Sequence, residues 1–144
     1  MNLKQALKRK NRLVGLIAEE YKKVAQYNSV DDVNQRPYSV KEALQNWLSL
    51  TNELVTLKCK IQLANNKVND KIFGLSELKT QVKLLKTLDC TAGKYYSRWS
   101  EDVPLTKVAE ISILERDAMV KNIETQIEKI QDELDEWNHQ TILP

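Results

Sequence analysis

Residues 39–68, SVKEALQNWLSLTNELVTLKCKIQLANNKV, carry the pattern that decides the fold. Apolar residues recur there at intervals of three and four, the spacing of a helix that packs along a partner helix. Ser39, followed three residues later by Glu42, is a capping box just ahead of this run. The stretch therefore predicts one helix roughly 45 Å long. We call its apolar positions the seam of this helix: Val40, Ala43, Trp47, Leu50, Leu54, Leu57, Ile61, Ala64 and Val68.

The same periodicity predicts three further helices. They span residues 3–27, 75–89 and 108–138, with Gly74 expected to separate the central helix from the shorter third one. Residues 93–107 contain Pro104, which blocks a continuous helix, so a short extended hairpin is expected there. The last helix carries a second long seam, made of Val120, Ile123, Ile127, Ile130, Leu134 and Trp137.

The composition fits this arrangement. A chain of 144 residues has the length of one ordinary domain, and three glycines and three prolines leave little material for the turns of many short strands. We predict an all-α fold, a single helical domain over residues 1–144, built as an antiparallel bundle of three long helices and one shorter helix. Short connections between neighbours favour this up-and-down arrangement.

Charge suggests which helices lie together. The first helix begins with a cluster of basic residues that includes Arg9, and the last helix ends with a cluster of acidic residues that includes Glu133. Each cluster stands at the unfavourable end of its own helix dipole, at a cost on the order of 0.3–1 kcal/mol. Antiparallel packing of the first helix on the last, within a chain or between chains, would offset that cost.

One stretch could bind a ligand. Lys94-Tyr95-Tyr96-Ser97-Arg98-Trp99 interleaves cations with aromatic rings, and the side chains of Tyr95, Tyr96, Arg98 and Trp99 could stack on a base or another ring-bearing ligand. Aromatic residues in a loop that crosses a helical core more often anchor the loop or lie in a subunit contact. We therefore favour anchoring over ligand binding.

Other chemistry finds no support in the sequence. Glu136 and His139 have the Glu-x-x-His spacing of di-metal bundles, but such sites need two copies and the chain has one histidine, so we expect no metal and no cofactor. The formal net charge of +2 makes nucleic-acid binding unexpected. No signal peptide or membrane-length apolar run is visible, which predicts a cytoplasmic protein, and Cys59 and Cys90 are expected to be reduced thiols.

Three short motifs point to a family. The opening Met1-Asn2-Leu3-Lys4-Gln5-Ala6-Leu7, the central residues 57–65 and the closing residues 134–141 together resemble the septicolysin-like family of bacterial, largely helical proteins. The resemblance implies a helical fold of about this length. The family's name suggests a pore-forming haemolysin, so a membrane-active function is implied as an alternative.

These patterns predict a non-enzymatic helical protein that self-associates, most simply as a homo-oligomer, because the two long seams exceed what one short helix can cover. The alternatives are a membrane-active cytolysin, which alone would involve a membrane, and a small-ligand or nucleotide binder using the 94–99 loop. No nucleophile or acid–base pair supports an enzyme.

Overall fold

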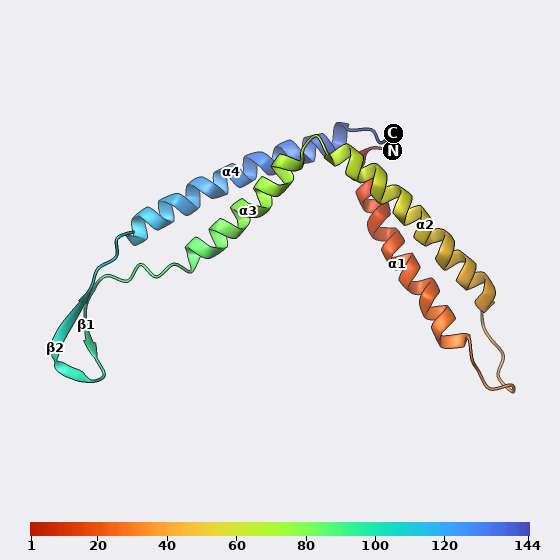
Figure 1. Ribbon diagram of the computed structural model, residues 1–144, viewed down its shortest axis with the longest axis horizontal. Coiled ribbons are helices and arrows are strands. Elements are labelled where there is room, and N and C mark those ends of the chain that lie inside the picture. The colour runs from red at the N-terminus through yellow and green to blue at the C-terminus, as the bar shows by residue number, and fades with distance from the viewer. The chain divides into compact units, whose positions relative to one another are not determined.

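The protein consists of four helices and one β-hairpin, shown in Figure 1, in a computed structural model that describes residues 1–99 and 102–144. The helices are α1 (Leu3–Tyr27), α2 (Val40–Asn65), α3 (Asn69–Lys86) and α4 (Ile113–Gln140), and the strands are β1 (Gly93–Ser97) and β2 (Ser100–Lys107). The predicted all-α fold is confirmed, including its three long helices, its shorter third helix and its short extended hairpin.

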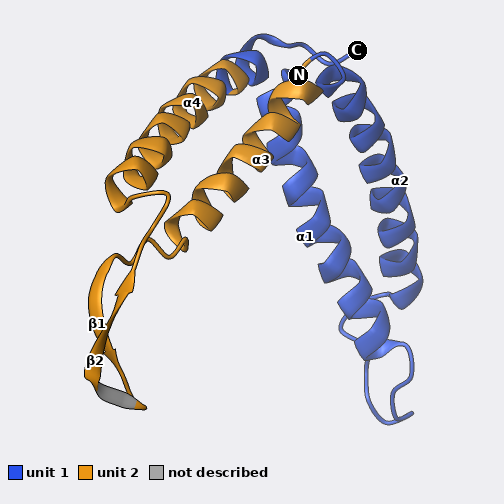
Figure 2. Ribbon diagram, turned by 60° about the vertical axis from the view of Figure 1, so that its left-hand side comes forward, with its two compact units in different colours: residues 1–67, 135–144 blue, residues 68–134 orange. Residues whose placement is uncertain are grey.

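The chain divides into two compact units, coloured separately in Figure 2. Unit 1 comprises residues 1–67 and 135–144, so it contains α1, α2 and the last turns of α4 together with the C-terminal tail. Unit 2 comprises residues 68–134, with α3, the hairpin and most of α4. The single domain expected from chain length stays a prediction.

In unit 1, α1 and α2 lie antiparallel. The Arg9 guanidinium near the start of α1 contacts the Glu53 carboxylate at 2.7 Å, and the rings of Tyr21 and Trp47 lie 5.3 Å apart further along. The ring of Tyr27, the last residue of α1, meets the ring of Tyr38, just before α2, edge to face. The seam of α2 therefore faces α1 along most of its length, as its heptad spacing predicts.

The start of α1 is fixed by a reciprocal cap. The Asn2 side chain accepts a hydrogen bond from the Gln5 backbone N–H at 2.9 Å, and the Gln5 side chain accepts one from the Asn2 N–H at 3.0 Å. This capping box satisfies two backbone donors that a helix start otherwise leaves unpaired. It positions Leu3 and Ala6, both 0% exposed, in the core of unit 1.

In unit 2, α3 and α4 also lie antiparallel, as Figure 1 shows. Lys71 at the start of α3 pairs with Glu133 near the end of α4 at 2.6 Å, and Lys86 at the end of α3 pairs with Glu124 at 2.9 Å. The buried residues of this unit are Val68, Leu75, Val82, Val120 and Leu134.

The break after α2 differs from the sequence prediction. The helix ends at Asn65 and α3 begins at Asn69, so Gly74, predicted to be the break, lies inside α3. Asparagine is a poor helix former, and Val68 at the start of α3 is buried with 6% exposure, which fixes the turn there. One glycine inside an 18-residue helix costs only about 1 kcal/mol and is tolerated.

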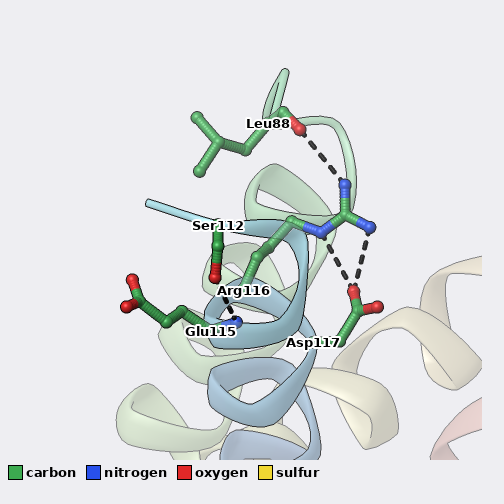
Figure 3. Close-up of polar contacts among 5 residues, drawn as sticks. All are labelled: Leu88, Ser112, Glu115, Arg116 and Asp117. Carbon is green, nitrogen blue, oxygen red and sulfur yellow. Dashed lines mark hydrogen bonds and ion pairs between the residues drawn. The ribbon is translucent and has the colours of Figure 1, made fainter. Parts of the chain in front are cut away.

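The start of α4 was also placed too early. The helix begins at Ile113, not at residue 108, because β2 extends to Lys107 and Ser112 caps the helix. The Ser112 hydroxyl accepts a hydrogen bond from the Glu115 backbone N–H at 3.1 Å (Figure 3). Ser112 and Glu115 have the Ser-x-x-Glu spacing of a capping box, a signal present in the sequence that would have located this boundary.

Within the chain, Arg9 and Glu133 do not pair with each other, and packing of the first helix on the last between chains stays a prediction. Arg9 pairs with Glu53 of α2, and Glu133 pairs with Lys71 of α3. Each of these two charges pairs with an opposite charge on the neighbouring helix of the same unit. Long, flexible side chains reach the nearest opposite charge on the helix that packs beside them.

Candidate interaction surfaces

The predicted seam residues line the contacts inside each unit. Ile61 and Leu134 are buried, each with 7% exposure. The remaining predicted seam residues are half-buried: Trp47, Leu50, Leu54, Leu57, Ile123, Ile127, Ile130 and Trp137. In each unit the neighbouring helix covers one side of the seam. The other sides of these side chains stay partly exposed to water.

The C-terminal tail completes the core of unit 1. Leu3, Ala6 and Ile61 form its buried centre, against which Trp137 and Leu143 pack. The Asn2 side-chain amide donates to the His139 carbonyl oxygen at 3.2 Å, and the Lys60 ammonium donates to the Pro144 carbonyl oxygen at 2.8 Å. His139 contributes its backbone carbonyl oxygen to these contacts.

A second apolar stripe runs along α2 and has no covering partner among the described residues. We call it the α2 stripe: Leu44, Leu48, Val55 and Leu63, with 40%, 50%, 56% and 62% of their surfaces exposed. At 3.6 residues per turn this stripe lies about 140° around the helix from the seam. Its residues fall outside the heptad positions of the seam, so the heptad pattern does not predict it.

The surroundings of the α2 stripe are almost free of charge. Between Ala43 and Leu57 the sequence contains a single charged residue, Glu53, whose carboxylate is paired with Arg9. Solvent-facing helix surfaces normally carry charged residues, whereas the centres of protein interfaces are depleted of them. This stretch of fifteen residues with a single charge is the sequence signal for an interface on α2.

Unit 2 has an apolar groove between its two helices. Its volume is about 450 Å³, and its walls come from one face of α3 and one of α4. Leu84 and Met119 in its lining are 63% and 45% exposed. The lining residues are Gln81, Leu84, Leu85, Leu88, Met119 and Ile123.

The aromatic stretch 94–99 lies in the hairpin and contacts no core. Tyr95 and Tyr96 belong to β1 and are 41% and 65% exposed, and Trp99 in the turn is 95% exposed. Arg98 is exposed beside it. The favoured prediction that these rings anchor the loop within the chain is therefore wrong. A hairpin that projects from the helix ends has no core within reach of its tip.

The aromatic residues also form no enclosed ligand site. The Lys107 ammonium lies over the Tyr95 ring, 5.4 Å from its centroid, and forms a cation–π contact with it. The described pockets are lined by other residues. Ligand binding by Tyr95, Tyr96, Arg98 and Trp99 stays a prediction.

The base of the hairpin is held by polar contacts, drawn in Figure 3. The Arg116 guanidinium on α4 donates to the Leu88 carbonyl oxygen just after α3, at 3.2 Å, and to the Asp117 carboxylate. On the β1 side, the Thr91 hydroxyl and backbone N–H both donate to the Asp89 carboxylate. These hydrogen bonds lower the pKa of Asp89, and the nearby Lys107 lowers it further.

Among the described residues no three histidine, cysteine or acidic side chains come together as metal ligands would. Cys59 and Cys90 are free thiols. Across residues 1–99 and 102–144, none of the helices combines the length and apolarity that crossing a bilayer requires. Comparisons with family models, with curated proteins and with solved structures give no match.

Proposed function

We propose that this protein is a non-enzymatic helical protein that self-associates, and that the α2 stripe packs antiparallel against the same stripe of a second copy. Two α1–α2 pairs would then form a four-helix arrangement across a two-fold axis near Asn52, with one surface patch contacting itself. The observation that carries this proposal is the exposed, uncharged stripe on a helix whose opposite face is already packed.

The exposed area supports association. The chain exposes 11194 Å². A compact monomer of 16.7 kDa would expose about 7,600 Å², and two separate compact domains of half that mass about 9,200 Å² together. The excess over two compact domains, about 2,000 Å², matches the roughly 1,000–2,500 Å² that each subunit buries in a homodimer with a large interface.

Sedimentation of paired variants tests this proposal. Leu48→Glu with Val55→Glu places two charges on the α2 stripe, which would be desolvated in the dimer, so we expect a monomer at concentrations where the wild type is an oligomer. Both positions are exposed in the single chain, so helicity measured by circular dichroism should be unchanged.

The matched control is Ser49→Glu with Thr56→Glu. These positions have the same seven-residue spacing on α2 and are exposed, but they lie about 100° away from the stripe. We expect this variant to associate like the wild type. A wild-type protein that sediments as a monomer at tens of micromolar, or stripe variants that associate as strongly as this control, would refute the proposal.

The two alternatives have direct tests of their own. Release of dye from anionic and neutral liposomes would support a membrane-active cytolysin. A thermal shift with a ring-bearing ligand that disappears in Trp99→Ala would support a ligand binder using the hairpin.

A further inference from the structure

The hairpin lacks the packing that normally stabilises two strands. No side chain of β1 from Gly93 to Tyr96 is buried, and neither is any of residues 102–107 in β2. A two-stranded hairpin alone is marginally stable in water, and independent stability needs a third strand or packing against a helix. The Arg116–Leu88 hydrogen bond joins the start of α4 to the chain just after α3 and leaves the strands uncovered. The outer edges of the hairpin are therefore the surfaces open to a partner.

Pro104 fixes which backbone groups of β1 face outward. It lies opposite Tyr96 in the antiparallel register, and Tyr95 lies opposite Leu105. Proline has no N–H, so Tyr96 and Pro104 cannot be a pair that exchanges two hydrogen bonds. Because hydrogen-bonded and non-hydrogen-bonded pairs alternate, Tyr95 bonds to β2 while the N–H and C=O groups of Lys94 and Tyr96 point away from it.

Pro104 also distinguishes the two outer edges. Its ring nitrogen faces outward from β2 and offers no donor, which is how natural edge strands block the addition of another strand. The outer edge of β1 has no proline among residues 93–97 and presents the donors and acceptors of Lys94 and Tyr96. The edge open to an added strand is therefore that of β1.

We propose that β1 of one copy pairs antiparallel with β1 of a second copy, across a two-fold axis at Tyr95, to give a four-stranded sheet. This inference rests on the proposed self-association and assigns it a second contact. Lys94 then lies opposite the partner's Tyr96, and by symmetry Tyr96 opposite the partner's Lys94. The outward groups of β1 have the two-residue spacing that lets both pairs exchange two hydrogen bonds.

The side chains favour a second copy in this register. Each Lys94 ammonium lies beside the ring of the partner's Tyr96, a cation–aromatic pair, and no like charges stand opposite one another. Tyr95 meets the partner's Tyr95 in the close, non-hydrogen-bonded pair, with Cα atoms about 4.5 Å apart. The aromatic rings that contact no core in one chain thus gain a cross-strand contact in the pair.

Disulfide trapping tests the register. In a Cys59→Ser, Cys90→Ser background, Tyr95→Cys should form an intermolecular disulfide under mild oxidation, because its Cα separation falls within the roughly 4.4–6.8 Å range of disulfides. Tyr96→Cys is the matched control, since its two copies are diagonal neighbours about 7–8 Å apart. We expect about a tenfold larger cross-linked fraction for Tyr95→Cys than for Tyr96→Cys.

A second pair of variants tests the backbone pairing. Adding Tyr96→Pro to Tyr95→Cys removes an outward N–H without touching the bonds to β2, so cross-linking should fall to the level of the control. Adding Tyr96→Val instead keeps the N–H and should preserve cross-linking. Equal cross-linking in these two double variants would overturn the proposed strand pairing.

The outcomes separate the two proposals. A monomeric wild type without Tyr95→Cys cross-linking would refute both. An oligomeric wild type in which Tyr95→Cys cross-links no better than Tyr96→Cys would overturn the β1 pairing and leave association through the α2 stripe standing. Cross-linking that persists in the Leu48→Glu, Val55→Glu variant at high concentration would show that β1 pairs independently of α2.

Discussion

The backbone N–H of Leu3 donates to the carbonyl oxygen of Thr141 at 2.8 Å, so the first residue of α1 is held by the residue that follows α4. Asn2 and Ile142 form an antiparallel bridge beside this bond, and the Leu143 N–H donates to the Met1 carbonyl oxygen at 3.1 Å. The two ends of the chain therefore close the core of unit 1 together.

This closure makes Leu3 a sensitive position. Its side chain is 0% exposed and packs in the cluster with Ala6 and Ile61. Leu3→Ala should lower the free energy of unfolding by about 2–5 kcal/mol, from lost burial and the cavity left behind. Urea denaturation measures the change. Lys4→Ala, at an exposed neighbouring position, should change it by no more than about 0.5 kcal/mol.

A charge in the seam should also be costly. Leu54 is half-buried on the face of α2 that meets α1. Leu54→Asp places a carboxylate in a partly desolvated position without a partner, and we expect a loss of about 1–3 kcal/mol in unfolding free energy. Thr56→Asp adds the same charge at an exposed position two residues away and off the α2 stripe, and should leave the denaturation midpoint nearly unchanged. Similar midpoints for both variants would contradict a packed seam.

Periodicity predicted the helices well and their boundaries less well. The bounds of α1, 3–27, follow from an apolar pattern interrupted only at Lys10 and agree with the structure. The loss of the apolar pattern near Asn65 agrees with the end of α2, whereas α3 begins at Asn69 and not at residue 75, because Val68 is buried and the turn there is packed. Apolar spacing reports burial, and burial persists through a turn when the turn is packed.

The candidate surfaces were harder to predict than the helices. The aromatic stretch 94–99 was identified, but its composition cannot distinguish rings that anchor a loop from rings that project on a hairpin. Trp99 projects because the strands carry it away from the ends of α3 and α4. The α2 stripe could have been found from the scarcity of charge between residues 43 and 57, where Glu53 is the one charged residue, a signal independent of the heptad.

The Ser112 cap gives a prediction for the start of α4. Ser112→Ala removes the acceptor for the Glu115 N–H and should cost about 1 kcal/mol. Amide exchange at Glu115 should accelerate, because its donor loses its side-chain partner at the helix end. Thr106→Ala, at an exposed position in β2, serves as the control. Unchanged exchange at Glu115 would contradict the cap.

The Lys71–Glu133 pair gives unit 2 a defined pH dependence. The hydrogen bond and charge of Lys71 lower the pKa of Glu133 below its ordinary 4.5, and those of Glu133 raise the pKa of Lys71 above its ordinary 10.5. The Glu133 contribution to stability is complete above pH 4.5 and is lost as the pH falls through its folded pKa. The Lys71 contribution is complete below pH 10.5 and is lost as the pH rises through its folded pKa.

Comparing Glu133→Gln with the wild type isolates this pair. The difference in melting temperature should stay constant between pH 4.5 and 10.5 and shrink on the acidic side, because protonated Glu133 no longer pairs with the Lys71 ammonium. Glu128→Gln, exposed on the same helix, corrects for the general effect of removing one acidic charge. A difference in melting temperature that grows as the pH falls below 4.5 would contradict this prediction. It would mean that the Glu133 carboxylate destabilises unit 2 and that other contacts hold α3 against α4.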